Sequence, residues 1–189
     1  MATSKDGVKT YFVTIPAHKF LHIENRESNG YWDFWQKQAL IPGQDCETIC
    51  GLLESIRGKL DDDGGEYAGQ VMGYLNDATG RLCDWGYLRT ECYGARLPAD
   101  YRGEVPAQML LTDIPEGEYL VFEHGPFDYE TENTQVETEI ERAMKDFDYA
   151  AHGVKLDTAQ GRVFYFYHDC TRFWKYVRPV KRLEDISGQ

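Results

Sequence analysis

A carboxylate flanked by aromatic residues is the feature of this sequence best suited to chemistry. The strand expected from Tyr87 to Ala95 alternates its side chains between two faces, with one set comprising Tyr87, Arg89, Glu91 and Tyr93 and the other Leu88, Thr90 and Cys92. We expect the second set to face a helix, so that Glu91 projects into an aromatic trough. There Glu91 can bind a cationic ligand or act as a general base toward water. The alternative is structural, an ion pair of Glu91 with Arg89 or Lys175.

Further aromatic residues follow in the second half of the chain. In the stretch GRVFYFYHD, Tyr165 and Tyr167 share one face of a strand. We expect these tyrosines to face the trough, because their hydroxyl groups need water or a ligand as a partner. Trp174 and Tyr176 share a face of the last strand, and we expect one in the core and the other in the pocket. Phe122 precedes Glu123 and belongs to the predicted ligand-binding set.

Three large aromatic residues, Tyr31, Trp32 and Trp35, crowd a short segment. They suit a lid over the trough, whose mouth Trp85 could also reach. The alternative is a small aromatic core that holds the long first connection in place. The predicted ligand-binding set is thus Tyr31, Trp32, Trp35, Trp85, Tyr87, Glu91, Tyr93, Phe122, Tyr165, Tyr167, Trp174 and Lys175.

Motifs for other chemistries are absent. The five histidines show no metal-ligand spacing, and neither a phosphate-binding glycine loop nor a GxSxG elbow occurs. Cys46 and Cys50 would share one face of a helix, where packing is favoured over metal binding. We therefore expect no cofactor and no bound metal.

Composition narrows the class of protein further. The 189 residues carry a formal charge of −12, and nowhere do Lys and Arg cluster, which argues against nucleic-acid binding. No apolar run approaches the length of a membrane span, and the first nine residues lack the features of a signal peptide. We expect a cytoplasmic protein with scattered, reduced cysteines.

The order of predicted elements indicates two similar halves. The first half begins with a strand over 11–24 that Pro16 interrupts. A short helix from Tyr31, ended by Pro42 and Gly43, comes next and is followed by a helix capped by Asp45. Two strands separated by a turn at 77–80 complete this half. The second half has a strand from Glu118, a helix near Thr134 with the capping box TQVE, and two final strands. This order predicts an α+β fold with a single domain, 1–189, that contains two βαββ repeats at about 10–98 and 108–183. The repeats form one long antiparallel sheet with helices on one face and a ligand trough on the other.

Three separated segments carry a resemblance to a known family. PEGEYLVFEHGPFDY, FWKYVRPVKRL and TIPAHKFLHIE resemble segments of GyrI-like domains. The resemblance implies a two-repeat βαββ fold that binds small molecules, often flat, apolar and cationic. Some members are effector-binding domains of bacterial transcription activators, several of which bind multiple drugs, and this chain resembles the stand-alone kind. One departure matters, since Lys175 occupies a position where many drug-binding members have an acid.

The resemblance also suggests specific activities. YWDFW, IPGQDCETICGLL and GRLCDWGYLRTECYG look closest to a stand-alone subgroup, some of whose relatives hydrolyse cyclopropane-bearing DNA-alkylating toxins. We therefore expect binding of flat, apolar and in part cationic small molecules. The alternative is a hydrolase in which Glu91 activates water while Tyr93 or Tyr167 donates a proton to the ligand carbonyl. A third interpretation is an acidic inhibitor of a DNA-binding enzyme, with a protein partner or a homodimer as its assembly.

Overall fold

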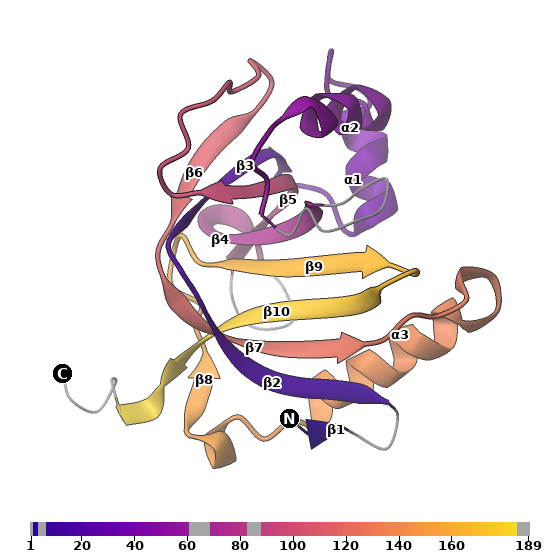
Figure 1. Cartoon of the computed structure of the whole chain (residues 1–189), viewed down its shortest axis with the longest axis vertical. Coiled ribbons are helices and arrows are strands. Elements are labelled where there is room, and N and C mark those ends of the chain that lie inside the picture. Colours follow the sequence, from indigo (N-terminus) through magenta and orange to yellow (C-terminus); the bar gives the residue numbers. More distant parts are fainter. Residues whose placement is uncertain (1, 4–6, 61–68, 83–87, 185–189) are drawn as a thin grey trace. The chain divides into compact units, whose positions relative to one another are not determined.

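The computed structural model describes residues 2–3, 7–60, 69–82 and 88–184. Its helices and antiparallel strands confirm the predicted α+β fold class. Contacts divide the chain into two compact units (Figure 1). The α3 unit draws on 1–15, 117–158 and 164–189, and the α1–α2 unit on 16–116 and 159–163.

The α3 unit joins strands that lie far apart in the sequence. Its antiparallel order is β1 (Ala2–Thr3), β2 (Val8–Ile15), β7 (Gly117–His124), β10 (Phe173–Arg182) and β9 (Val163–Asp169), with the short β8 (Val154–Leu156) also pairing with β10. Helix α3 (Tyr129–Asp146) runs along β7 in Figure 1 and is followed by the one-turn helix η1 (Ala150–His152). Val136, Ile140 and Met144 of α3 are buried against strand residues, as their helical spacing predicts.

The start of α3 differs from the prediction. The helix begins at Tyr129, and the side chain of Asp128 caps it by accepting hydrogen bonds from the backbone amides of Glu130 and Thr131 at 2.9 and 3.1 Å. The carboxylate of Glu132 accepts a hydrogen bond from the amide of Asp128 in return, at 3.0 Å. The capping box predicted at Thr134 is therefore wrong, because Asp128 and Glu132 supply the same reciprocal bonds before the helix reaches Thr134.

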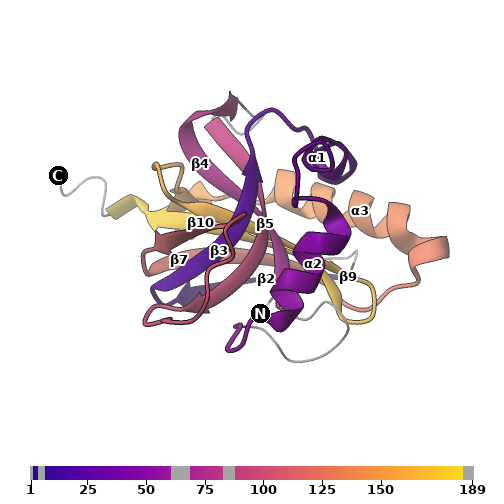
Figure 2. The ribbon, with the colours of Figure 1, turned by 90° about the horizontal axis from the view of Figure 1, so that it is seen from above.

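The α1–α2 unit places two helices beside four antiparallel strands. The strand order is β4 (Gln70–Leu82), β5 (Leu88–Pro98), β3 (His18–Asn25) and β6 (Leu110–Ile114). Helices α1 (Tyr31–Gln38) and α2 (Cys46–Ser55) lie on the same side of β3 and β5 (Figure 2). Asp45 caps α2 as predicted, since its carboxylate accepts a hydrogen bond from the amide of Thr48 at 3.1 Å.

The first predicted strand is broken where Pro16 lies. β2 ends at Ile15 and β3 begins at His18, and the two pieces belong to different units. Pro16 lacks an amide hydrogen for a strand ladder, which accounts for the break. The sequence therefore located this interruption correctly.

Two other local features were not predicted correctly. β4 continues through the expected turn at 77–80 to Leu82, with a register irregularity between Asn76 and Arg81 opposite Arg89. The carboxylate of Asp77 accepts a hydrogen bond from the amide of Thr79 at 2.8 Å, as in a turn. The residues at 77–80 therefore form a bulge within the strand instead of reversing the chain. The strands β6 and β8 were missed.

Among the described residues, no helix combines the length and apolarity needed to cross a bilayer.

Candidate functional site

Glu91 lies at the amino-terminal end of α1. Its carboxylate accepts hydrogen bonds from the hydroxyl of Ser28 at 2.6 Å and from the backbone amide of Gly30 at 2.9 and 3.1 Å. The side chain is only 1 % exposed and makes no ion pair with a described residue. The amides and positive end of α1 therefore stabilise the buried charge. The alternative predicted for Glu91, an ion pair with Arg89 or Lys175, is not found among the described residues. Ser28 and Gly30 lie in the polar turn predicted at 25–30, but the sequence did not identify them as partners of Glu91.

The turn that precedes α1 is built to present these donors. The side-chain oxygen of Asn25 accepts hydrogen bonds from the amides of Glu27 and Ser28, at 2.9 and 2.8 Å. Gly30 has φ +103° and ψ 169°, a conformation that L side chains rarely adopt. A glycine at this position therefore lets the chain turn into α1 while its amide points at Glu91.

The face of β5 that the helices cover is the opposite of the one expected. Trp35 of α1 packs on Tyr93 and Gly30 binds Glu91, so α1 covers the Glu91 and Tyr93 face. The expectation that Thr90 and Cys92 face the helix is wrong. Alternation fixes which residues share a face of a strand, but it does not decide which of the two faces a distant helix covers.

Tyr93 lies at the centre of an aromatic and polar cluster. Its hydroxyl donates a hydrogen bond to the side-chain oxygen of Gln70 at 2.6 Å, and its ring meets that of Trp35 edge to face at 5.0 Å. Burial is the main reason that the pKa of Tyr93 is raised well above its usual value, and the neighbouring Cys50 thiol adds to it. Tyr93 is therefore a neutral hydrogen-bond donor at physiological pH.

Two cysteines of α2 border this cluster. Cys46 and Cys50 share one helix face as predicted, with their sulfur atoms 3.8 Å apart. Burial, followed by the neighbouring Cys46, raises the pKa of Cys50 to about 12. A thiol with so high a pKa is a poor nucleophile at neutral pH, so Cys50 contributes to packing and not to reactivity.

The aromatic residues of α1 are only partly covered. Tyr31 makes edge contacts with Trp32 and Trp35 at centroid distances of 5.3 and 6.4 Å. Trp35 is buried, whereas Tyr31 is 41 % and Trp32 72 % exposed. The indole nitrogen of Trp35 is buried without a hydrogen-bond partner among the described residues. The helix thus combines an anchored ring, Trp35, with two rings open to solvent.

Part of the predicted set lies elsewhere. Trp85 and Tyr87 fall outside the described residues. Phe122 and Trp174 belong to the core beneath α3. In the same unit, Phe166 packs on that core, while Tyr167 pairs in register with Lys175, whose ammonium lies 4.8 Å from the Tyr167 ring centre. Tyr165 is fully buried.

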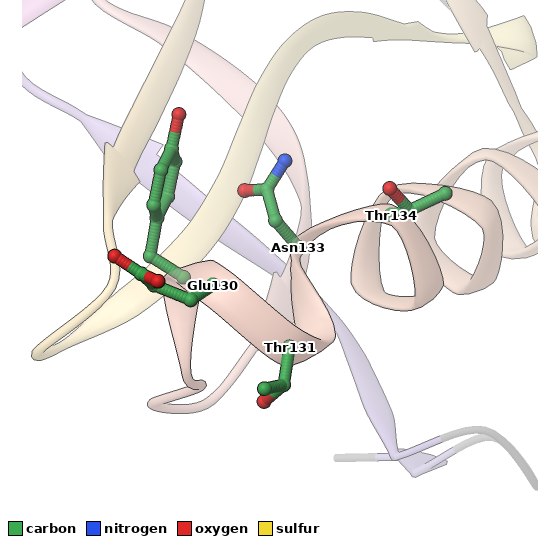
Figure 3. Close-up of a pocket in the computed structure, with 5 residues that line it drawn as sticks. Glu130, Thr131, Asn133 and Thr134 are labelled. Carbon is green, nitrogen blue, oxygen red and sulfur yellow. The ribbon is translucent and has the colours of Figure 1, made fainter.

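A shallow pocket lies elsewhere, on the first turns of α3. It measures about 380 Å³ and is lined by Tyr129, Glu130, Thr131, Asn133 and Thr134 (Figure 3). All of these residues come from one helix, and none belongs to the predicted set. Glu91, Tyr93 and the aromatic residues of α1 instead come from two separate segments, β5 and α1, and form the candidate ligand site.

Comparison with solved structures identifies the fold. The structure of SAV2435 bound to tetraphenylphosphonium superimposes with a TM-score of 0.52 and 16 % identity, covering 94 % of this chain and 96 % of that one. A putative bacterial transcription regulation protein from Staphylococcus aureus MU50 gives 0.50 and 14 %, covering 92 % and 98 %. The chain has a GyrI-like fold. No family model and no curated protein sequence matches it.

The comparison confirms the resemblance to GyrI-like domains at the level of the fold. At these identities it assigns no activity to individual residues. Within this GyrI-like fold, the role of Glu91 and its aromatic neighbours depends on their own geometry.

Proposed function

We propose that the chain binds apolar organic cations at the aromatic end of α1. The observation that carries this proposal is the buried Glu91 carboxylate, which two hydrogen-bond donors hold but no described side chain neutralises. A cation that enters its neighbourhood gains electrostatic energy without first displacing a lysine or arginine.

The aromatic rings supply the second half of the recognition. Trp32 and Tyr31 are exposed and directly follow the turn that holds Glu91. Cations bind to the faces of aromatic rings, Trp most strongly, with about 0.5–2 kcal/mol per contact. The tetraphenylphosphonium bound by the structurally similar SAV2435 is a ligand of this class, which supports the proposal.

Calorimetric titration of the full chain with tetraphenylphosphonium tests the proposal. We expect Trp32→Ala to weaken binding by about tenfold, because it removes one cation–π contact. Tyr129→Ala is the matched control, since Tyr129 is an exposed aromatic residue of α3 at 52 % exposure. Absence of binding, or equal losses in both variants, would overturn the proposal.

A second candidate function, hydrolysis of cyclopropane-bearing alkylating compounds, draws support from Glu91 and Tyr93 together. The two residues share a face of β5, and the unneutralised carboxylate suits a general base while the neutral Tyr93 hydroxyl suits a hydrogen-bond donor to the ligand carbonyl. Mass spectrometry of such a compound incubated with the protein distinguishes the functions. Many turnovers of a water adduct would support catalysis, whereas ligand retained unchanged would support binding alone.

A further inference from the structure

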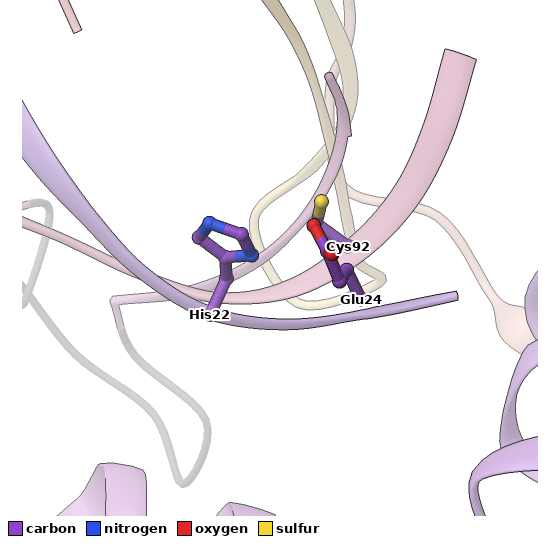
Figure 4. A group of neighbouring side chains, drawn as sticks. All are labelled: His22, Glu24 and Cys92. Carbon is purple, nitrogen blue, oxygen red and sulfur yellow. The ribbon is translucent and has the colours of Figure 1, made fainter. Parts of the chain in front are cut away.

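A second group of reactive side chains lies on the opposite face of β5. Cys92 alternates with Glu91 and Tyr93, and it pairs in register with Glu24 of β3. His22 lies two residues before Glu24 and therefore shares its face. The ligand atoms of His22, Glu24 and Cys92 all lie within 4.8 Å of one another, and Figure 4 shows the three side chains on the same side of the strands.

These three side chains provide the donor types of a zinc site. Imidazole nitrogen, thiolate sulfur and carboxylate oxygen are the ligands that Zn²⁺ takes, and a sulfur ligand disfavours Mg²⁺ and Ca²⁺. Ligands of tetrahedral zinc lie roughly 3.5 Å apart. A separation of 4.8 Å therefore has to contract by roughly 1 Å. Glu24 has room to rotate, because its side chain is 21 % exposed.

The surroundings of His22 suit a metal ligand. Its imidazole is fully buried. One ring nitrogen lies 2.8 Å from the hydroxyl of Thr112, and the other lies 3.3 Å from the carbonyl oxygen of Ile23. When one nitrogen binds a metal, the other keeps a partner that fixes the orientation of the ring.

Acidic side chains lie near Cys92. Burial is the main reason that the pKa of this thiol is raised well above its usual value, and the carboxylates of Glu24, Glu91 and Asp77 add to it. Arg26 bridges two of them, at 3.4 Å from Glu24 and 3.5 Å from Asp77, and its side chain is 52 % exposed. A guanidinium held at such distances on the surface is displaced easily, which leaves an entry path for a cation through Glu24.

We propose that His22, Glu24 and Cys92 form a binding site for a divalent transition metal of the zinc class, with Arg26 as the displaceable counter-ion. Three protein ligands leave a fourth position for water. The metal ties β3 to β5, on the face of β5 opposite to the one that carries Glu91 and Tyr93.

Titration of the metal-free full chain with Co²⁺, followed by displacement with Zn²⁺, tests the proposal. We expect one bound ion per chain, with the visible bands of tetrahedral Co²⁺ and a near-ultraviolet thiolate-to-metal band. Cys92→Ser should abolish the thiolate band. The matched control is Cys46→Ser/Cys50→Ser, which removes the sulfur pair of α2 and should leave the band intact.

Glu24→Gln provides a second readout at a partly exposed position, where misfolding is less of a risk than at buried Cys92. We expect it to weaken Co²⁺ binding at least tenfold while the circular dichroism of the apo-protein is unchanged. A wild-type chain without a thiolate band overturns the proposal. The same holds if the band depends on Cys46 and Cys50, or if Glu24→Gln binds Co²⁺ as tightly as wild type.

Discussion

The carboxylate of Glu91 accepts a hydrogen bond from the backbone amide of Gly30 at 2.9 Å, so a residue of β5 fixes the start of α1. This contact joins residues 61 positions apart in the sequence. It holds the helix that carries Tyr31 and Trp32. The same carboxylate therefore positions the aromatic residues and supplies the negative charge of the proposed ligand site.

Two substitutions separate these roles of Glu91. Glu91→Gln keeps an oxygen acceptor for Ser28 and Gly30 but removes the charge, so we expect a stability loss below about 1 kcal/mol. Glu91→Ala leaves both donors without their acceptor and should cost about 1–3 kcal/mol. Urea denaturation measures the two losses.

Ligand binding should respond differently to the same change. Glu91→Gln should weaken tetraphenylphosphonium binding and leave the affinity for neutral triphenylphosphine oxide unchanged, because only the cation interacts with the lost charge. Calorimetry of both compounds provides the comparison. An equal loss for both would indicate that Glu91 acts only by holding α1.

Gly94 and Gly51 should respond in opposite directions to alanine. A Cβ atom on Gly94 would lie 1.8 Å from the carbonyl oxygen of Leu21, a backbone atom that cannot move aside. We expect Gly94→Ala to cost more than about 3 kcal/mol. Gly51 lies within α2 with open space around its Cα, so Gly51→Ala should stabilise by about 1 kcal/mol. Thermal unfolding distinguishes the variants, and similar midpoints would contradict the strand pairing of β3 with β5.

The cap of α3 can be located by mutation. Asp128→Ala removes an acceptor for two helix amides and should cost about 1 kcal/mol. Thr134→Ala, at the cap position that the sequence suggested, should change stability by less than about 0.5 kcal/mol because Thr134 lies inside the helix on its exposed side. A larger stability loss for Thr134→Ala than for Asp128→Ala would indicate that the helix begins near Thr134.

His168 should make the protein less stable in acid. Burial against neighbours that include Trp174 lowers the pKa of His168 below its usual 6.5. Between the folded and unfolded pKa values the unfolded chain binds more protons, so stability falls as the pH drops below 6.5. Histidine NMR titration should give a pKa below 6.5, and Trp174→Ala should raise it by exposing the ring. A wild-type value at or above 6.5 would refute this prediction.

Local sequence determined much of the secondary structure. Pro16 marks the break between β2 and β3, Asp45 caps α2, and the spacing of Val136, Ile140 and Met144 marks the buried side of α3. These features depend on residues a few positions apart, whose geometry the backbone fixes. Alternation likewise established that Glu91 and Tyr93 share a face.

Long-range contacts decided what the sequence left open. The helix-covered face of β5 was assigned incorrectly, because the packing of α1 depends on Gly30 and Trp35, some 60 residues away. β2 pairs with β7, and Cys92 meets His22 and Glu24, only through strand pairing between distant segments. The alternation period of a strand is a local property, whereas its partners and its covered face follow from the burial of apolar surface by the whole fold.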